Sequence, residues 1–504
     1  MIELDILIHF LFTIILLLPI VLISRSVVAG TKYSPILIIV IFGLLLGFII
    51  NLTGLGTPGL PEFKMIGFTS GATITALVVT FFVGGQKLRN TFLKPKMPKE
   101  DDVTLNNEEV ILGTKGTQLV FLVRSVFILL GIQAIILIIN GKGYEELTMY
   151  LPLIAFFGFV GAIILIDSKA IIHDKRKYLG RGVIEIIMII AILITSYYIS
   201  VYIKEIIALP QIFFAMLISS GLGMYFSDWR PGPTMRALLF GGIPMVLAAV
   251  FIVGGTRLVE AFSLEGMTQV MAYGFFGQLF WMFFGIFLLV FIGKSNHVDV
   301  LAPGMAGSLS HSGLTGASTA GDMGETAKER APIMINIPFF GHLFVFTILA
   351  ISASRGELLL LPALVVVLIG VIFTYFALKT LRNSNSEKDD IKGLIYFSLG
   401  WQLVAVFGGF TLLHFSGMSL EYAAMANSSA ISHFGLFASI QGGMFGVEAA
   451  SLISFVFAMP FLIHPVVFGM FGKAMSNNGE MPKKIVAVLA FLGIVGVIIS
   501  LVFL

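Results

Sequence analysis

Small and hydroxyl-bearing residues dominate the stretch from Leu301 to Ala320, which lies between two strongly apolar segments. Hydroxyl and backbone carbonyl oxygens bind sodium without a fixed charge, and the N-termini of short helices attract anions. Small residues also let helices pack closely, so each single serine has a purely structural interpretation. The cluster as a whole favours a binding site for an ion and a small anion.

A second stretch repeats the first. Ser310-His311-x-Gly313-Leu314 matches Ser432-His433-x-Gly435-Leu436, and Pro338-Phe339-x-x-His342 matches Pro460-Phe461-x-x-His464 at the same offset. After a two-residue slip, Gln278 matches Gln402. These matches among scarce residue types indicate an internal duplication. Duplications with a binding site between the repeats are typical of secondary transporters.

The residues that we expect to form this site are polar and lie in or beside the two copies. The candidate substrate- and ion-binding residues are Gln278, Ser310, His311, Ser312, Thr315, Ser318, Thr319, Asp322, Gln402, Asn427, Ser432 and His433. Among them, Thr315 and Ser318 are the candidate sodium ligands. Asp322 is the candidate carboxylate for a coupling ion, although charged neighbours such as Glu325 and Lys328 equally indicate the water interface.

Four histidines recur in the duplication, namely His311, His342, His433 and His464. The pattern favours hydrogen-bonded packing or substrate contact through neutral imidazole over a metal site, and a proton relay is an intermediate alternative. No HExxH motif, nucleophile–base pair or phosphate-binding loop is found. We therefore expect neither an enzyme nor a primary pump, and no cofactor or bound metal other than a sodium ion.

Composition identifies the class of protein. The chain of 504 residues is 57% hydrophobic and 12% charged, and it has no cysteine. These values exclude a soluble globular protein and disulfides, and the net charge of +3 reflects basic loops rather than a nucleic-acid interface. The expected partners are the lipid bilayer and a small-molecule substrate, and the expected location is the cell (inner) membrane.

Apolar segments predict an all-α polytopic membrane protein with about 14 transmembrane helices, since each segment is long enough to cross about 30 Å of hydrocarbon. The predicted spans are 6–24, 34–52, 64–85, 117–140, 148–166, 182–203, 208–226, 236–255, 270–293, 331–353, 357–379, 393–416, 448–471 and 485–504. Lys and Arg concentrate in alternate loops, which fixes the orientation. The stretches 301–320 and 420–441 are predicted to be two re-entrant hairpins.

This segmentation divides the chain into a N-terminal membrane region at 1–235, a first repeat at 236–353, a second repeat at 354–471 and a last helix at 472–504. Each repeat holds three spans, so the second is predicted to be inverted relative to the first. The hairpins would then enter from the cytoplasm and from outside, respectively, and meet tip to tip. A weaker echo relates Phe82-Val83-Gly84-Gly85 to Ile252-Val253-Gly254-Gly255.

Other charged residues lie near the ends of the predicted elements. We expect Asp299 and Glu421 to cap the N-termini of the two hairpins. Glu185 falls inside a predicted span, and we expect its side chain to reach the interface, where burial costs little.

Gln278, the run GKSNHVDVLAPGMAG at 293–307, GASTAGDM at 316–323 and IPFFGHLF at 337–344 together resemble the second half of the bacterial sodium–glutamate symporters, which are related to 2-hydroxycarboxylate (citrate-type) transporters. The resemblance covers roughly residues 270–350. The SHxGL motif and the extra spans depart from the family pattern.

This resemblance implies a sodium symporter for a small organic anion or amino acid such as glutamate. It also implies a homodimer, in which a transport domain carrying both hairpins moves against a dimerised scaffold by an elevator-type mechanism. The alternative is a cation/proton antiporter, which would need a carboxylate in the middle of a span. The sequence shows no clear candidate for that carboxylate.

Overall fold

A computed structural model describes residues 19–28, 34–53, 61–92, 175–204, 209–229, 232–259, 263–458 and 463–502, together with a few isolated positions. The described part is helical and contains no strand. The helices of the N-terminal part and the centre are α2 (Ile36–Leu52), α3 (Pro61–Phe92), α7 (Lys175–Ile203), α8 (Gln211–Tyr225), α9 (Pro233–Ala237), η2 (Leu238–Gly242) and α10 (Ile243–Thr256).

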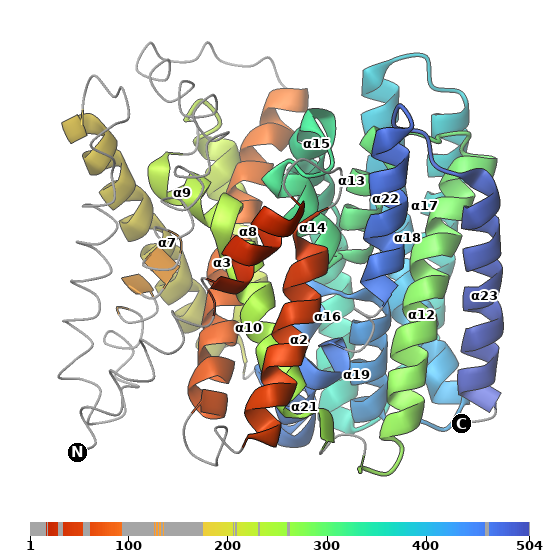
Figure 1. Cartoon of the computed structure of the whole chain (residues 1–504). Coiled ribbons are helices and arrows are strands. Elements are labelled where there is room, and N and C mark those ends of the chain that lie inside the picture. Colours follow the sequence, from red (N-terminus) through yellow and green to blue (C-terminus); the bar gives the residue numbers. More distant parts are fainter. Residues whose placement is uncertain are drawn as a thin grey trace.

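The remaining helices contain the duplication. They are α12 (Met267–Phe287), η3 (Leu288–Ile292), α13 (Val298–Leu309), α14 (Ser312–Ala320), α15 (Glu325–Asn336), α16 (Pro338–Arg355), α17 (Leu360–Arg382), α18 (Glu387–Phe415), α19 (Leu420–Ile431), α20 (Phe434–Gln441), α21 (Val447–Ala458), α22 (His464–Ser476) and α23 (Lys483–Val502). Figure 1 shows α2, α3, α8 and α10 on one side, α12, α17 and α23 on the other, and α13, α14 and α19 between them.

Within the described residues, five helices are long and apolar enough to cross a membrane, namely Gly180–Ile203, Met267–Ile292, Leu360–Arg382, Glu387–Phe415 and Lys483–Val502. They indicate a helical, membrane-spanning protein. The spans predicted at 117–140 and 148–166, and most of the span at 6–24, lie outside the described residues. The total of about 14 spans therefore stays a prediction.

Two predicted spans are not single straight helices. The segment 331–353 falls on α15 and α16, which are bent by 47° relative to each other. The bend coincides with Pro338, which has no N–H for the helical hydrogen bond. The segment 448–471 falls on α21 and α22, and residues 459–462 between them lie outside the described residues.

The two hydroxyl-rich stretches each form a helical hairpin, α13–α14 and α19–α20, with a turn of two residues between the helices. The turns are equivalent in detail, because Ser310 has φ 47° and Ser432 has φ 52°, both in the left-handed region. Each hairpin is almost entirely buried by the surrounding helices. Their irregular turns thus lie within protein, as non-helical backbone at membrane depth must.

The glycines of the weaker sequence match, Gly85 and Gly255, have the same role in helix packing. A Cβ atom added at Gly85 in α3 would overlap the carbonyl oxygen of Ser220 in α8. A Cβ atom added at Gly255 in α10 would overlap the carbonyl oxygen of Leu44 in α2. The matched glycines therefore bring two helix pairs, α3 with α8 and α10 with α2, into close backbone contact.

Three expectations for charged residues were wrong. Glu185 is 1% exposed and does not reach solvent, because its carboxylate accepts backbone N–H bonds from Gly232, Thr234 and Met235 at the start of α9. The N-caps of α13 and α19 are His297 and Ser419, not Asp299 and Glu421. Asp299 and Glu421 lie in the first turns of α13 and α19, where their negative charges interact favourably with the positive end of the helix dipole.

Candidate functional site at the hairpin tips

The tips of the two hairpins touch in the interior of the protein. The backbone N–H of Ser312 donates to the carbonyl oxygen of Ser432 at 3.0 Å, and that of Phe434 donates to the carbonyl oxygen of Ser310 at 3.1 Å. The Ser312 and Ser432 hydroxyls lie 3.0 Å apart. These bonds form an isolated antiparallel bridge around His311 and His433. The contact places the N-terminal ends of α14 and α20 beside each other, and each end carries partial positive charge.

Both tip histidines cap a helix. The His311 Nδ1 atom accepts the N–H of Leu314 at 3.1 Å, and the His433 Nδ1 atom accepts the N–H of Leu436 at 3.0 Å. A ring nitrogen that accepts a hydrogen bond carries no proton. The neutral rings therefore carry their protons on Nε2, and both Nε2 atoms are hydrogen-bond donors.

This tautomer bears on the alternatives that the sequence left open. Metal ligation through Nε2 would move the ring proton to Nδ1, where it would meet the capped N–H group. Proton relay through the ring would also require the cap to break. The geometry thus favours neutral imidazoles that donate hydrogen bonds.

One set of three residues, here called the Gln402 cluster, consists of Gln402, His433 and His342. The two imidazole Nε2 atoms lie 2.9 Å apart. The amide nitrogen of Gln402 lies 3.1 Å from His342 Nε2 and 3.2 Å from His433 Nε2. Since His433 Nε2 carries a proton, it donates to His342 Nε2. The other terminal amide atom of Gln402 is buried and has no hydrogen-bond partner among the described residues, whichever way the amide is turned.

The matching set, here called the Gln278 cluster, consists of Gln278, His311 and His464. The Gln278 side-chain amide lies 2.9 Å from His311 Nε2 and 3.4 Å from His464 Nδ1. Because His311 Nε2 is a donor, the amide must present its oxygen to it, and the amide orientation follows from this bond. One amide atom of Gln278 then lacks a partner in the described part of the chain, whichever way the amide is turned.

Each cluster combines the two copies of the duplication. The Gln278 cluster takes its glutamine and tip histidine from the first copy and His464 from the second. The Gln402 cluster takes its glutamine and tip histidine from the second copy and His342 from the first. The sequence identified all four histidines as recurring but did not predict this exchange.

The first hairpin also carries buried hydroxyls, and Thr315 lines a cavity together with His342 of the Gln402 cluster. Thr315 and Ser318 are both buried in α14, and the Ser318 hydroxyl has no hydrogen-bond partner among the described residues. A cavity of about 10 Å³ lies beside Ser310, Thr315 and His342, against apolar side chains of α3 and α8. That volume suffices for about one water molecule. Ser318 does not line this cavity.

Two predicted site residues, Asn427 and Asp322, form their hydrogen bonds away from the tip contact. Asn427 donates to the carbonyl oxygen of Val406 in α18 at 2.7 Å, so it joins two helices. Asp322 lies beyond the far end of α14, where it accepts a hydrogen bond from Ser34 at 3.0 Å. Burial raises the pKa of the Asp322 carboxyl, and Arg25 and Ser34 oppose this shift. Thr319 lies in α14, but its side chain is outside the described residues.

Sequence reasoning overlooked one buried polar residue, Asn336. Its amide nitrogen donates to the carbonyl oxygen of Phe81 in α3 at 3.1 Å, and its oxygen accepts the Ser220 hydroxyl of α8 at 2.5 Å. Asn336 therefore ties the end of α15 to the helices that border the cavity. The signal in the sequence was a lone asparagine in an otherwise apolar segment.

Comparison with protein families, curated proteins and solved structures found no match to this chain. The resemblance to sodium–glutamate symporters thus stays a prediction that rests on the quoted motifs.

Proposed function

We propose that this protein is an ion-coupled secondary transporter for a small organic anion or amino acid such as glutamate, with sodium as the coupling ion. The observation that carries the proposal is the buried contact between two duplicated hairpin tips, flanked by two clusters that exchange histidines between the copies. A purely structural contact would need neither the exchange nor the unpartnered amide atoms of both glutamines.

The chemistry of the tips suits an anionic group. The Nε2–H groups of His311 and His433 are donors, and α14 and α20 direct their N-terminal ends toward the contact. Neither cluster contains a carboxylate that would repel an anion. A carboxylate of the substrate would bond to these donors when the tips separate.

Sodium suits the hydroxyl oxygens of the first hairpin. Ser318 presents a buried oxygen without a partner in the described part of the chain, and Thr315 precedes it by three residues on the same helix face. Coupling through a proton is less well supported, because the caps on His311 and His433 hold both rings neutral. Two carboxylates that an antiporter could use already have partners, since the buried Glu185 accepts three backbone N–H groups and Asp322 accepts the Ser34 hydroxyl.

The cavity beside the tips is far smaller than glutamate, so the described conformation corresponds to a closed site. In the proposed cycle the hairpins are re-entrant and inverted, the first opening to the cytoplasm and the second to the outside. The bonds between the tips break when substrate binds. The hairpins then move together against a dimerised scaffold in the cell (inner) membrane, as in an elevator-type mechanism.

Thermal unfolding of the purified protein tests the binding part of this proposal. Glutamate, other amino acids and di- and tricarboxylates are added in sodium or in potassium buffer. A substrate at about 100 times its Kd adds about 2.7 kcal/mol of stability, and we expect this gain in sodium only. An equal gain in potassium would contradict sodium coupling, and no gain with any compound would contradict the substrate class.

A further inference from the structure

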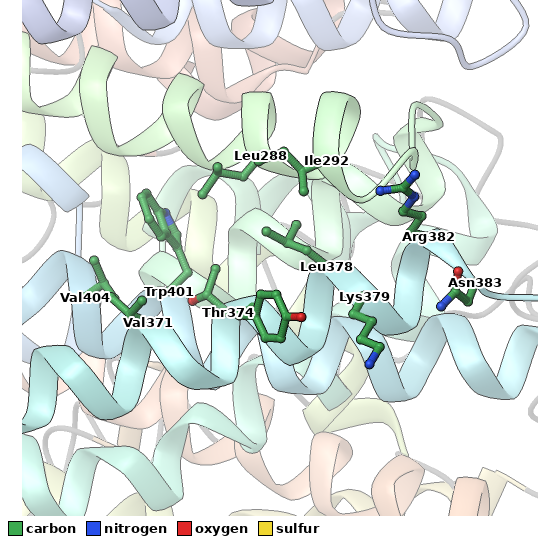
Figure 2. Close-up of a pocket in the computed structure, with 11 residues that line it drawn as sticks. Leu288, Ile292, Val371, Thr374, Leu378, Lys379, Arg382, Asn383, Trp401 and Val404 are labelled. Carbon is green, nitrogen blue, oxygen red and sulfur yellow. The ribbon is translucent and has the colours of Figure 1, made fainter.

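A second cavity lies on the outer face of the helix bundle, between α17, α18 and η3. Its volume is about 600 Å³, within the range of small-molecule sites. It shares no lining residue with the cavity at the hairpin tips. Figure 2 shows it as a long slot bordered on one side by Leu288 and Ile292 and on the other by α17.

The slot has two chemically different ends. One end is lined by Val371, Val404 and Trp401, and the other by Lys379, Arg382 and Asn383, as Figure 2 shows. The lining contains no acidic residue.

The basic end is not neutralised by the protein. Lys379 and Arg382 are both exposed. Neither forms an ion pair in the described part of the chain. The carboxylate of Glu387, which follows in the chain, binds Arg330 at 3.2 Å instead. Two cations and an amide therefore line this end of the slot without an anionic partner in the described part of the chain.

The slot has the depth of one membrane leaflet. Helix α17 rises about 16 Å between Val371 and Arg382 at about 1.5 Å per residue, which is about half of the ~30 Å hydrocarbon layer. The same helix is a candidate membrane span and exposes Leu368, Ile372 and Phe376. The apolar end thus lies at membrane depth, and the basic end lies where α17 leaves the membrane.

We propose that this slot binds one anionic phospholipid. The phosphate would bind Lys379 and Arg382, with Asn383 as a further donor, and an acyl chain would lie along Val371, Val404 and Trp401. Basic pockets between membrane helices bind anionic headgroups in this way, and each basic residue near the surface contributes about 1 kcal/mol. The proposal does not depend on the transport function, because the slot is separate from the hairpin tips.

Native mass spectrometry of the purified protein in detergent tests this proposal. Phosphatidylglycerol and phosphatidylcholine with identical acyl chains are titrated separately, and we expect tighter binding of phosphatidylglycerol. The double variant Lys379→Gln/Arg382→Gln should weaken phosphatidylglycerol binding roughly thirtyfold, the equivalent of about 2 kcal/mol. Phosphatidylcholine binding should change little.

The control is Lys483→Gln/Lys484→Gln, which removes the same charge from exposed residues at the start of α23. It should keep the lipid preference of the wild type. Val371→Trp, at a side chain that is 50% exposed, should fill the apolar end and weaken both lipids. Free glycerol phosphate should not displace the lipid, since it lacks a chain for the slot. An unchanged preference in Lys379→Gln/Arg382→Gln, an equal loss in the control, or displacement by glycerol phosphate would overturn the proposal.

Discussion

His311 and His433 each use one ring nitrogen to cap a helix and offer the other as a donor. Helices are usually capped by Ser, Thr, Asp or Asn, whose short side chains keep their remaining polar atoms close to the capped turn. A histidine at this position does both tasks, and the cap fixes which nitrogen holds the proton. At the residue scale, this arrangement lets a buried tip present a fixed donor without a charge.

The two tasks of His311 can be separated by substitution. His311→Asn keeps a capping oxygen but removes the Nε2–H donor, whereas His311→Ala removes both. We expect uptake to fall at least tenfold in both variants, and His311→Ala to be less stable than His311→Asn by about 1 kcal/mol, the usual value of an N-cap. Uptake assays and thermal unfolding measure the two effects. Normal uptake in His311→Asn would show that the donor has no role.

Substitution of Ser318 tests whether its hydroxyl is an ion ligand or only packs inside the protein. A buried hydroxyl without a partner destabilises a protein, so Ser318→Ala should leave stability in sodium-free buffer unchanged or raise it. If the Ser318 hydroxyl binds the ion, however, its removal should weaken sodium binding by about 1–3 kcal/mol. The half-saturating sodium concentration for uptake should then rise roughly tenfold or more.

Ser439→Ala is the matched control in the second hairpin, because the Ser439 hydroxyl donates to the carbonyl oxygen of Gly435 within its own helix. Sodium dependence should be normal in this variant. If Ser318→Ala also showed normal sodium dependence, the coupling ion would have to bind elsewhere.

At the scale of the elements, the sequence located both hairpins to within about three residues, because small residues and the duplicated turn motif are local signals. It could not show that His464 belongs with Gln278 and His342 with Gln402. Spacing along the chain determines which residues share a helix, whereas the exchange depends on how α16 and α22 pack. Pro338 marks the break between α15 and α16 in the sequence. Because the apolar run is long, a single span at 331–353 was predicted instead.

The contact between the hairpins can be locked covalently. The hydroxyls of Ser312 and Ser432 lie 3.0 Å apart, which brings the two side chains within the range of a disulfide. The chain has no native cysteine, so Ser312→Cys/Ser432→Cys introduces a single pair. We expect oxidant to cross-link this pair and to stop uptake, and reductant to restore it. Each single cysteine variant is the control and should be insensitive to oxidant.

At the scale of the whole molecule, composition was sufficient to predict a helical membrane protein. So many apolar side chains cannot all be buried in the protein interior, and those on the surface require lipid around them. The number of spans and their inversion were inferred from loop charges and from the duplication. They stay predictions, because several of the spans lie outside the described residues.

Inversion can be tested with two equivalent positions directly after the hairpins. Glu325 and Val447 occupy matching places in the two copies, and both are exposed. A cysteine at Glu325 should react with a membrane-impermeant thiol reagent only from the cytoplasm, and a cysteine at Val447 only from outside. Labelling of both variants from the same side would contradict the inverted duplication.

Uptake into proteoliposomes tests the central claim most directly. Sodium and proton gradients are imposed separately, with glutamate, other amino acids and carboxylates as labelled substrates, on the wild type and on oxidised Ser312→Cys/Ser432→Cys. The account predicts that a sodium gradient alone drives accumulation of at least one of these compounds by the wild type, and that the oxidised variant accumulates none. Accumulation driven by a proton gradient without sodium, or undiminished uptake through cross-linked hairpins, would contradict it.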